Sequence, residues 1–410
     1  MHIVALTGSF YPNMMAPSAC VKPYLQELAK EHLVEVVCPV SNHYSRDCIV
    51  LDGIRINYVS NWLNDRFVEA NTNLLDGKKS LISRFTLLTV RAIRFLQEKL
   101  SPRPYDRSLI KEYLSKLEEI DSKSEIDVLI SVTYPFNTHV AALSYKEQKH
   151  SLKWLTYTTD PLAYNEATPI VSWKKNNAIK IERQIYEACD TCIVTEELYE
   201  NVVKDYGISE EKVLVLHYLV ETEKACSDVV AFERCRAQAL YAGCLFYRVR
   251  NPQTMLSVFS KLKDVDLCLY VTGDRQCRKM LKREYPSNIH ISGVVPLDDY
   301  YRKLSQADVL VNLSNNAKLQ APHKLMELVS TGKPIINFYY FKNTGYKIIE
   351  KYPLGINVSN YSDPRDMVEA ISVFINNNRN KKLGAKEIND IYSEYLLLNQ
   401  MESIKRVLQN

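Results

Sequence analysis

Two charged side chains that could bind a phosphorylated ligand lie close together in the segment from Gln320 to Pro334. A loop there leads into a predicted helix over residues 324–330, whose first turn carries Lys324 and Glu327. Free backbone N–H groups at a helix N-terminus attract phosphate, and the lysine adds a full positive charge. Glu327 could accept hydrogen bonds from a ribose diol. Alternatively, it is only an early-helix carboxylate that the helix dipole favours.

Along the whole chain, the predicted elements alternate between strand and helix. A strand over His2–Leu6 is followed by a loop, a helix over Ser18–His32 and a strand over Val34–Cys38, which is the unit of a doubly wound sheet. Two helices are expected at Leu297–Gln306 and Lys324–Ser330. Further predicted strands are Ile54–Tyr58, Val128–Val132, Lys153–Tyr157, Thr191–Val194, Val213–Leu216, Ala239–Ala242, Leu267–Val271, Ile289–Ser292, Val309–Asn312 and Pro334–Asn337.

This pattern predicts an α/β protein with two Rossmann-like domains, each a doubly wound parallel sheet, that face a cleft. We expect the first domain over residues 1–217, a polar hinge over 218–236 and the second domain over 237–380. Residues 381–410 are predicted to be helical. Ligands of such sheets bind at the carboxyl ends of the strands, so the cleft is the expected site.

The composition excludes several classes of protein. A net charge of +4 over 410 residues is far below that of a typical nucleic-acid-binding domain. The cysteines lack disulfide spacing, and the one Cys-x-x-Cys pair, Cys189 and Cys192, has no second pair to complete a zinc site. No stretch approaches the ~20 apolar residues that cross a bilayer. We therefore expect a cytoplasmic protein, at most peripheral at the inner face of the cell membrane.

The segment from Gln320 to Pro334 also resembles a known family signature. It is similar to the donor-binding motif of the retaining glycosyltransferases of family four ("glycosyl transferases group 1"), which have the GT-B fold. The matching residues are Pro322, His323, Lys324, Glu327, Gly332, Lys333 and Pro334. The resemblance implies that Glu327 binds the nucleotide ribose. The family's earlier glutamate falls on Leu319 or Gln320, so the Gln320 amide is expected to contact the sugar.

A second stretch, Leu240 to Pro252, resembles the family's glycine turn and the basic residue that neutralises the donor diphosphate. Gly243 matches the turn, Arg250 is the first choice for the base, and Arg248 is the second. An arginine suits this role because its planar fork can grip two phosphate oxygens. The alternative is a pair of surface arginines.

Two further loops extend the resemblance, so that it spans roughly residues 239–340. Gly273 lies in Val271-Thr272-Gly273-Asp274, and Val294 lies in the stretch from Ile289 to Pro296, whose backbone frames the base in the family. In this fold the last helix commonly crosses back to the N-terminal domain. The resemblance therefore predicts that crossing for Gln400–Leu408.

The N-terminal half matches the family more loosely. Gly8 and Ser9 lie where relatives have a loop after the first strand, and we place them on the acceptor side. His139 follows a loop in which some members place a functional histidine; alternatively, it is structural. Asp160 resembles an Asp-Pro of one subgroup and could orient the acceptor hydroxyl or cap the next turn.

Two other sequence features bear on metal binding and on membrane binding. Asp264-Val265-Asp266 matches the metal-binding Asp-x-Asp of other glycosyltransferases, but it precedes a buried strand, and GT-B enzymes generally use no metal. Neither a metal nor a cofactor is therefore expected. Residues 80–100 form a helix with Arg84, Arg91 and Arg94. Its apolar face either packs on its own domain or binds a membrane surface or acceptor.

The resemblance implies transfer of a sugar from a nucleotide-diphosphate donor, with retention and without metal. Arg250, Lys324, His139 and Asp160 are the candidate catalytic residues. The expected acceptor is a cell-surface or lipid-linked glycan, as in polysaccharide biosynthesis. The alternatives are a nucleotide-sugar epimerase of the same fold and a non-catalytic nucleotide-sugar-binding or scaffold protein.

Overall fold

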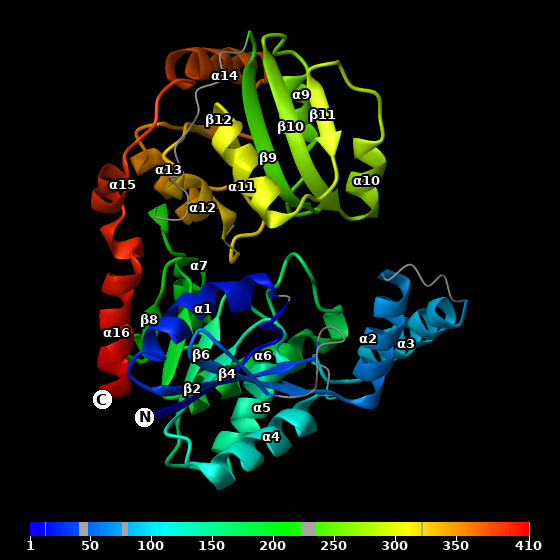
Figure 1. Cartoon of the computed structure of the whole chain (residues 1–410), viewed down its shortest axis with the longest axis vertical. Coiled ribbons are helices and arrows are strands. Elements are labelled where there is room, and N and C mark those ends of the chain that lie inside the picture. The colour runs from blue at the N-terminus through cyan, green and yellow to red at the C-terminus, as the bar shows by residue number, and fades with distance from the viewer. Residues whose placement is uncertain are drawn as a thin grey trace. The chain divides into compact units, whose positions relative to one another are not determined.

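A computed structural model of the chain describes residues 1–12, 14–40, 48–75, 81–105, 107, 109–222, 235–320 and 323–409. The chain divides into two compact units, one formed by Met1–Leu216 with Gln400–Asn410 and the other by His217–Asn399. Each unit is built on its own sheet, with helices on both sides (Figure 1). The predicted class, two α/β domains built on doubly wound parallel sheets, is confirmed, with one antiparallel edge strand as the exception.

The described part of the first unit contains an eight-stranded sheet in the order β3-β4-β2-β1-β5-β6-β7-β8. Its strands are β1 His2–Leu6, β2 Leu33–Pro39, β3 Ile49–Leu51, β4 Ile54–Val59, β5 Val128–Val132, β6 Lys153–Thr158, β7 Thr191–Val194 and β8 Val213–Val215. Its helices are α1 Ala16–Leu28, α2 Trp62–Leu75, α3 Leu81–Leu100, α4 Ile110–Lys123, α5 Asn137–Lys146, α6 Lys175–Ala188 and α7 Glu196–Glu200.

The edge of this sheet departs from the all-parallel prediction, because β3 pairs antiparallel with β4. The two-residue turn between them is Asp52-Gly53, and both residues have positive φ, 53° and 78°. Two central residues with positive φ are typical of a type I′ hairpin turn, for which Asp-Gly is a favoured sequence. The hairpin gives the sheet a short antiparallel edge strand.

The described part of the second unit contains a six-stranded parallel sheet in the order β11-β10-β9-β12-β13-β14. Its strands are β9 Ala237–Leu245, β10 Val265–Gly273, β11 Ile289–Ser292, β12 Val309–Leu313, β13 Ile335–Tyr339 and β14 Gly355–Ser359. Its helices are α9 Gln253–Phe259, α10 Arg275–Leu281, α11 Leu297–Gln306, α12 Lys324–Ser330, α13 Thr344–Lys351, α14 Pro364–Asn378 and α15 Ala385–Ile391.

Two apolar clusters cover the two faces of this second sheet. Alternate residues of β9 belong to different clusters: Ala239 and Tyr241 to one, Leu240 and Ala242 to the other. Helices α9, α10 and α14 contribute to the first cluster, and α11, α12, α13 and α15 to the second. Side chains alternate between the faces of a strand, so a sheet buried on both sides is the expected result.

The last helix, α16 (Leu397–Gln409), joins the first unit from Gln400 onward. There the Tyr24 hydroxyl donates to Gln400 Oε1 at 2.9 Å, and Lys405 Nζ lies 2.9 Å from Glu31 Oε1. Of the predicted hinge over residues 218–236, residues 223–234 lie outside the described residues.

Candidate functional site

The strand order of the second unit defines the place where a ligand is expected. From β9 the chain proceeds to β10 and β11 on one side, and from β12 it proceeds to β13 and β14 on the other. Strands β9 and β12 are therefore neighbours at a topological switch point. In open α/β sheets, ligands bind at such a point, beside the carboxyl ends of the strands.

The loop after β9 is closed by backbone hydrogen bonds between Phe246 and Arg250. Asp274, after β10, accepts a hydrogen bond from the Tyr247 N–H at 2.8 Å and also caps α10. On the other side, the Asn316 N–H after β12 donates to the Val249 carbonyl at 2.6 Å. The loop after β9 is therefore hydrogen-bonded to the segments that follow both neighbouring strands, β10 and β12.

Two glycines of the predicted donor site permit this arrangement. Gly243 has a φ of 153°, which L side chains rarely adopt. A Cβ on Gly273 would lie 2.9 Å from the Leu245 carbonyl oxygen, so glycine lets the ends of β9 and β10 approach each other.

The Arg250 side chain is fixed at the switch point by two hydrogen bonds. Its Nε donates to Asn315 Oδ1 at 2.9 Å, and its Nη1 donates to the Cys244 carbonyl at 3.3 Å. Asn315 is itself buried and donates from Nδ2 to the Gln320 carbonyl at 3.0 Å. Asn315 thus connects the arginine to the loop that leads into α12. Asn315 does not stand out in the sequence, since an asparagine after a strand is a common turn residue.

Lys324 opens α12 and lies near Arg250. Its Nζ sits 4.1 Å from the centroid of the Tyr300 ring. Burial lowers the pKa of Lys324, Glu327 opposes that shift, and the positive charge of Arg250 lowers the pKa further. Two cations, one in the loop after β9 and one on the first turn of α12, therefore act on each other. Such a pair is favourable when an anion lies between or beside its members.

Glu327 lies one turn further along α12 and is half-buried. Burial raises the pKa of this carboxyl, whereas Lys324 and the hydroxyls of Tyr300 and Tyr301 lower it. The predicted lysine and glutamate are thus brought together on the first turn of the helix, beside two tyrosines that the sequence analysis did not identify.

The other predicted donor-side residues differ in their surroundings. Gln320 is buried, and the His323 ring lies edge-on to the Tyr218 ring with 5.2 Å between centroids. Val294 follows β11 with 75% of its surface exposed. Arg248 is exposed, and within the described residues no hydrogen bond or ion pair of its side chain is found. Pro322 lies outside the described residues.

Two other residues of the family-like motif have roles within the fold. Gly332 has a φ of 74°, and a Cβ there would lie 2.3 Å from the Leu383 carbonyl oxygen. Lys333 is buried and donates from Nζ to the Ser305 carbonyl at 2.6 Å and to the Ala307 carbonyl at the end of α11. Lys333 therefore joins the segment after α12 to the end of α11, and glycine at 332 lets the Leu383 backbone approach.

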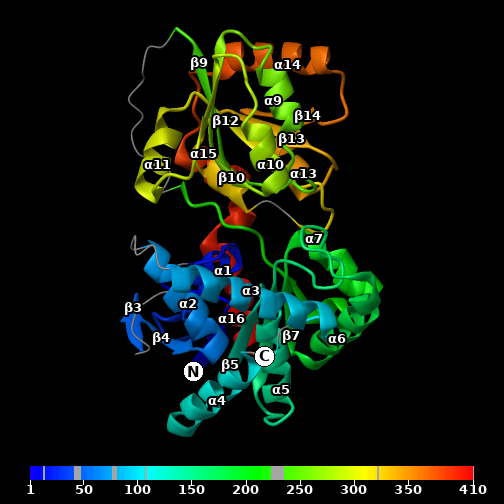
Figure 2. The ribbon, with the colours of Figure 1, turned by 90° about the vertical axis from the view of Figure 1, so that its right-hand side faces the viewer.

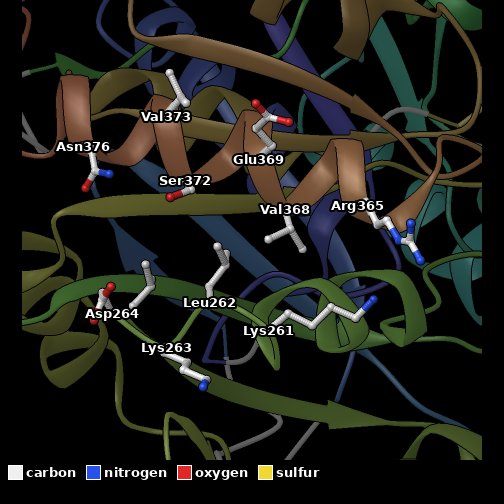
Figure 3. Close-up of a pocket in the computed structure, with 11 residues that line it drawn as sticks. Lys261, Leu262, Lys263, Asp264, Arg365, Val368, Glu369, Ser372, Val373 and Asn376 are labelled. Atoms are coloured by element: carbon white, nitrogen blue, oxygen red, sulfur yellow. The ribbon is translucent and has the colours of Figure 1, made fainter.

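The Asp-x-Asp sequence lies at the opposite end of the sheet from the switch point. Asp266, near the start of β10, lies 3.3 Å from Arg236 Nη1. Asp264 lines a separate pocket of about 570 Å³ between α14 and the turn before β10, whose charged residues are of both signs (Figure 3). Across the part of the chain that the structure describes, no group of three metal-ligating side chains is found.

In the first unit, His139, which the resemblance made a candidate catalytic residue, lies in the core. Its side chain is fully buried; Nδ1 lies 2.7 Å from Ser131 Oγ, and Nε2 lies 3.0 Å from Thr158 Oγ1. Burial lowers its pKa to about 3, so the ring is neutral at physiological pH. Both ring nitrogens are engaged inside the fold, which corresponds to the structural alternative.

The predicted residues Gly8 and Ser9 shape the loop after β1. A Cβ on Gly8 would lie 2.0 Å from Pro135 Cδ, so only glycine fits there. Ser9 Oγ accepts a hydrogen bond from the Met15 N–H at 2.8 Å, just before α1. Both residues have a structural explanation in this position.

Asp160 lies in the loop after β6 and is half-buried. The following turn is anchored by Glu182, a buried residue of α6 that the sequence analysis did not identify. Glu182 accepts hydrogen bonds from the Leu162 N–H at 2.8 Å and the Ala163 N–H at 3.0 Å, and from the Tyr206 hydroxyl at 2.5 Å. The loop that carries Asp160 is therefore held by a buried carboxylate.

Comparison with known proteins identifies the fold. No family model and no curated protein matches the sequence. Among solved structures, sucrose-phosphate synthase from Thermosynechococcus elongatus has a TM-score of 0.69 at 12% identity, covering 100% of this chain and 98% of that one. HepE of Anabaena in complex with UDP-glucose has a TM-score of 0.64 at 10% identity, covering 100% and 99%. A protein assigned as a UDP-N-acetylglucosamine 2-epimerase, from Listeria monocytogenes, has a TM-score of 0.55 at 11% identity, covering 100% and 95%. The chain therefore has the GT-B fold.

Proposed function

We propose that this protein is a glycosyltransferase that moves a sugar from a nucleotide-diphosphate donor to an acceptor hydroxyl. The observation that supports it most directly is the pairing of Arg250 with Lys324 at the switch point of the second unit, with Glu327 one turn behind. The solved structure of HepE, which has the same fold, contains UDP-glucose.

The chemistry of this set suits a diphosphate leaving group. When the bond between the anomeric carbon and the donor phosphate breaks, negative charge grows on the diphosphate and the sugar becomes oxocarbenium-like. The Arg250 guanidinium and the Lys324 ammonium are held in advance by Asn315 and by the Tyr300 ring. Preorganised charges of this kind stabilise the transition state without a cost of reorganisation.

The finer details rest on the resemblance to family four. We propose retention of configuration, with the acceptor hydroxyl attacking the face that the phosphate leaves, and stabilisation of the diphosphate by Arg250 and Lys324 without a metal. Glu327 would accept hydrogen bonds from the ribose, and Gln320 would contact the sugar. Asp160 remains the acceptor-side candidate, for a glycan or lipid-linked acceptor. No direct contact of His139 with a ligand is proposed, because its ring is enclosed.

A thermal-shift screen with UDP, GDP, ADP, TDP and CMP tests the donor site. A ligand at 100 times its dissociation constant stabilises the native state by about 2.7 kcal/mol. We expect a shift with one diphosphate, lost in Arg250→Ala and retained in Arg248→Ala, the matched control. Loss of Arg250 should lower the rate of sugar transfer by about 10²–10³-fold. A shift that survives removal of both Arg250 and Lys324 would exclude this site.

The epimerase alternative is favoured by one observation, the similarity to the Listeria protein. An epimerase converts the donor without an acceptor. Incubating the protein with each labelled nucleotide sugar, alone and with added glycan acceptors, and separating the products by chromatography, distinguishes the two activities. A transferase releases labelled sugar to water or to an added acceptor, whereas an epimerase returns an isomeric nucleotide sugar. Nucleotide binding with neither product, both without and with added acceptors, would favour a non-catalytic protein.

A further inference from the structure

Helix α3 presents an apolar face that its own unit does not cover. Leu81, Phe85 and Leu88 are 80%, 72% and 64% exposed, and Phe95 is also exposed. These positions are spaced by three, four and seven residues, so they line one side of an α-helix. The structure thus excludes the interpretation that this face packs on the first unit.

The opposite side of α3 is the one that packs. Leu87 and Val90 are buried, and the Arg94 guanidinium lies 4.8 Å from the centroid of the Phe67 ring in α2. Figure 1 shows α2 and α3 side by side at the periphery of the first unit, and Figure 2 shows the same pair from the side that faces away from the unit. The helix is therefore held in place by one face while the other points away from the unit.

Positive charge borders the exposed face. Arg84 and Arg91 are exposed, seven residues apart, and so lie on the same flank of the helix. Within the described residues, no ion pair of either guanidinium is found. The sequence of α3 contains four basic residues and the single acid Glu98, which leaves a net positive charge.

We infer that α3 is an in-plane anchor that binds the surface of a bilayer containing anionic lipid. A helix with a long apolar face and flanking basic residues lies at the boundary of headgroups and acyl chains, with its charges on the lipid phosphates. The charge favours an anionic surface over a second, similarly charged copy of the helix. No helix in the described part of the chain is long and apolar enough to span a membrane, so α3 would lie on the bilayer.

The experiment is flotation of the full chain with vesicles of phosphatidylcholine containing 30% phosphatidylglycerol, at 50 mM and 300 mM salt. We expect binding at low salt that is weaker at high salt and absent with phosphatidylcholine alone. Double substitution of Phe85→Ser with Leu88→Ser should abolish it. Arg84→Gln with Arg91→Gln should weaken it, by about fivefold per arginine if each contributes about 1 kcal/mol.

Control variants replace one exposed leucine and one exposed arginine elsewhere: Leu398→Ser for the apolar substitutions and Arg278→Gln for the arginines. These should bind as the unchanged protein does, and all variants should show the same circular-dichroism melt. The proposal is overturned if the unchanged protein does not float at low salt, or if the α3 variants float as well as the controls. It is also overturned if the α3 substitutions instead dissociate a dimer seen by light scattering. Nucleotide binding is measured separately, so this inference does not depend on the proposed function.

Discussion

Arg250 Nε donates a hydrogen bond of 2.9 Å to Oδ1 of Asn315, although the two residues are 65 positions apart in the chain. The bond joins the loops after β9 and β12, which diverge at the switch point. It sets the direction of the guanidinium before any ligand arrives. A side chain that is oriented in advance loses less conformational entropy on binding.

Replacing Asn315 with alanine should weaken binding of the nucleoside diphosphate. The arginine then loses its orienting acceptor, and a hydrogen bond to a charged group contributes about 1.5–3 kcal/mol. We expect at least a tenfold rise in the dissociation constant, measured by isothermal titration. Asn316→Ala is the matched control, because Asn316 contributes its backbone N–H, which the substitution keeps. Equal effects of the two substitutions would contradict the orienting role of Asn315.

The affinity for a diphosphate should fall as pH rises. The fall should begin at a lower pH than it would if Lys324 had the pKa of an ordinary lysine. Burial lowers the pKa of Lys324, so its ammonium loses its proton below the usual value near 10.5 and the attraction to phosphate is lost on the alkaline side. In Lys324→Arg, the guanidinium stays charged over this range. The measurement is the dissociation constant of the same nucleotide for the unchanged protein and for Lys324→Arg, from pH 7 to 10. In the ratio of the two constants, the titration of the ligand itself cancels. A ratio independent of pH would show that Lys324 does not hold the phosphate.

Acid should destabilise the first unit through His139. The pKa of this buried ring is about 3 in the folded protein, against about 6.5 when unfolded. Between these values the unfolded state binds the extra proton, so stability is complete above pH 6.5 and falls as pH is lowered. The contribution is about 1.4 kcal/mol per pH unit.

The same prediction can be followed by fluorescence, because all three tryptophans, Trp62, Trp154 and Trp173, belong to the first unit. Urea unfolding at pH 7 and pH 5 should show a smaller loss of stability in His139→Gln than in the unchanged protein. If both lose the same free energy of unfolding, the histidine is protonated in the fold and the assignment of a neutral core residue is wrong.

Gly332→Ala should destabilise the second unit by about 2–4 kcal/mol, since the residue has positive φ and its Cβ would clash with the Leu383 carbonyl. The control is Gly293→Ala, because no atom lies within 4 Å of a Cβ built there. Differential scanning calorimetry should show a lower melting temperature for the first variant and little change for the second. An unchanged melting temperature in Gly332→Ala would mean that the chain relaxes around the new methyl group.

Much of the fold follows from local patterns in the sequence. Strands β5, β7 and β11 and helices α11 and α12 have the predicted bounds, because burial on one or both sides imposes periodicities that can be read from neighbouring residues. The short strand β3 and the last strand β14 were not predicted. β3 has only three residues, and β14 is half-buried with a polar centre at Asn357, so neither shows a clear pattern.

What the sequence determined by itself is the order of the elements and the identity of the residues suited to phosphate chemistry, since Arg250 and Lys324 stand out by type and motif. Only the tertiary structure decided which of the candidates have partners. It placed Asn315 against Arg250, enclosed His139 between Ser131 and Thr158, and left one face of α3 uncovered. The physical reason is that burial and hydrogen-bond partners arise from strands and helices far apart in the chain. Periodicity shows that a helix has an apolar face, but packing decides what covers it.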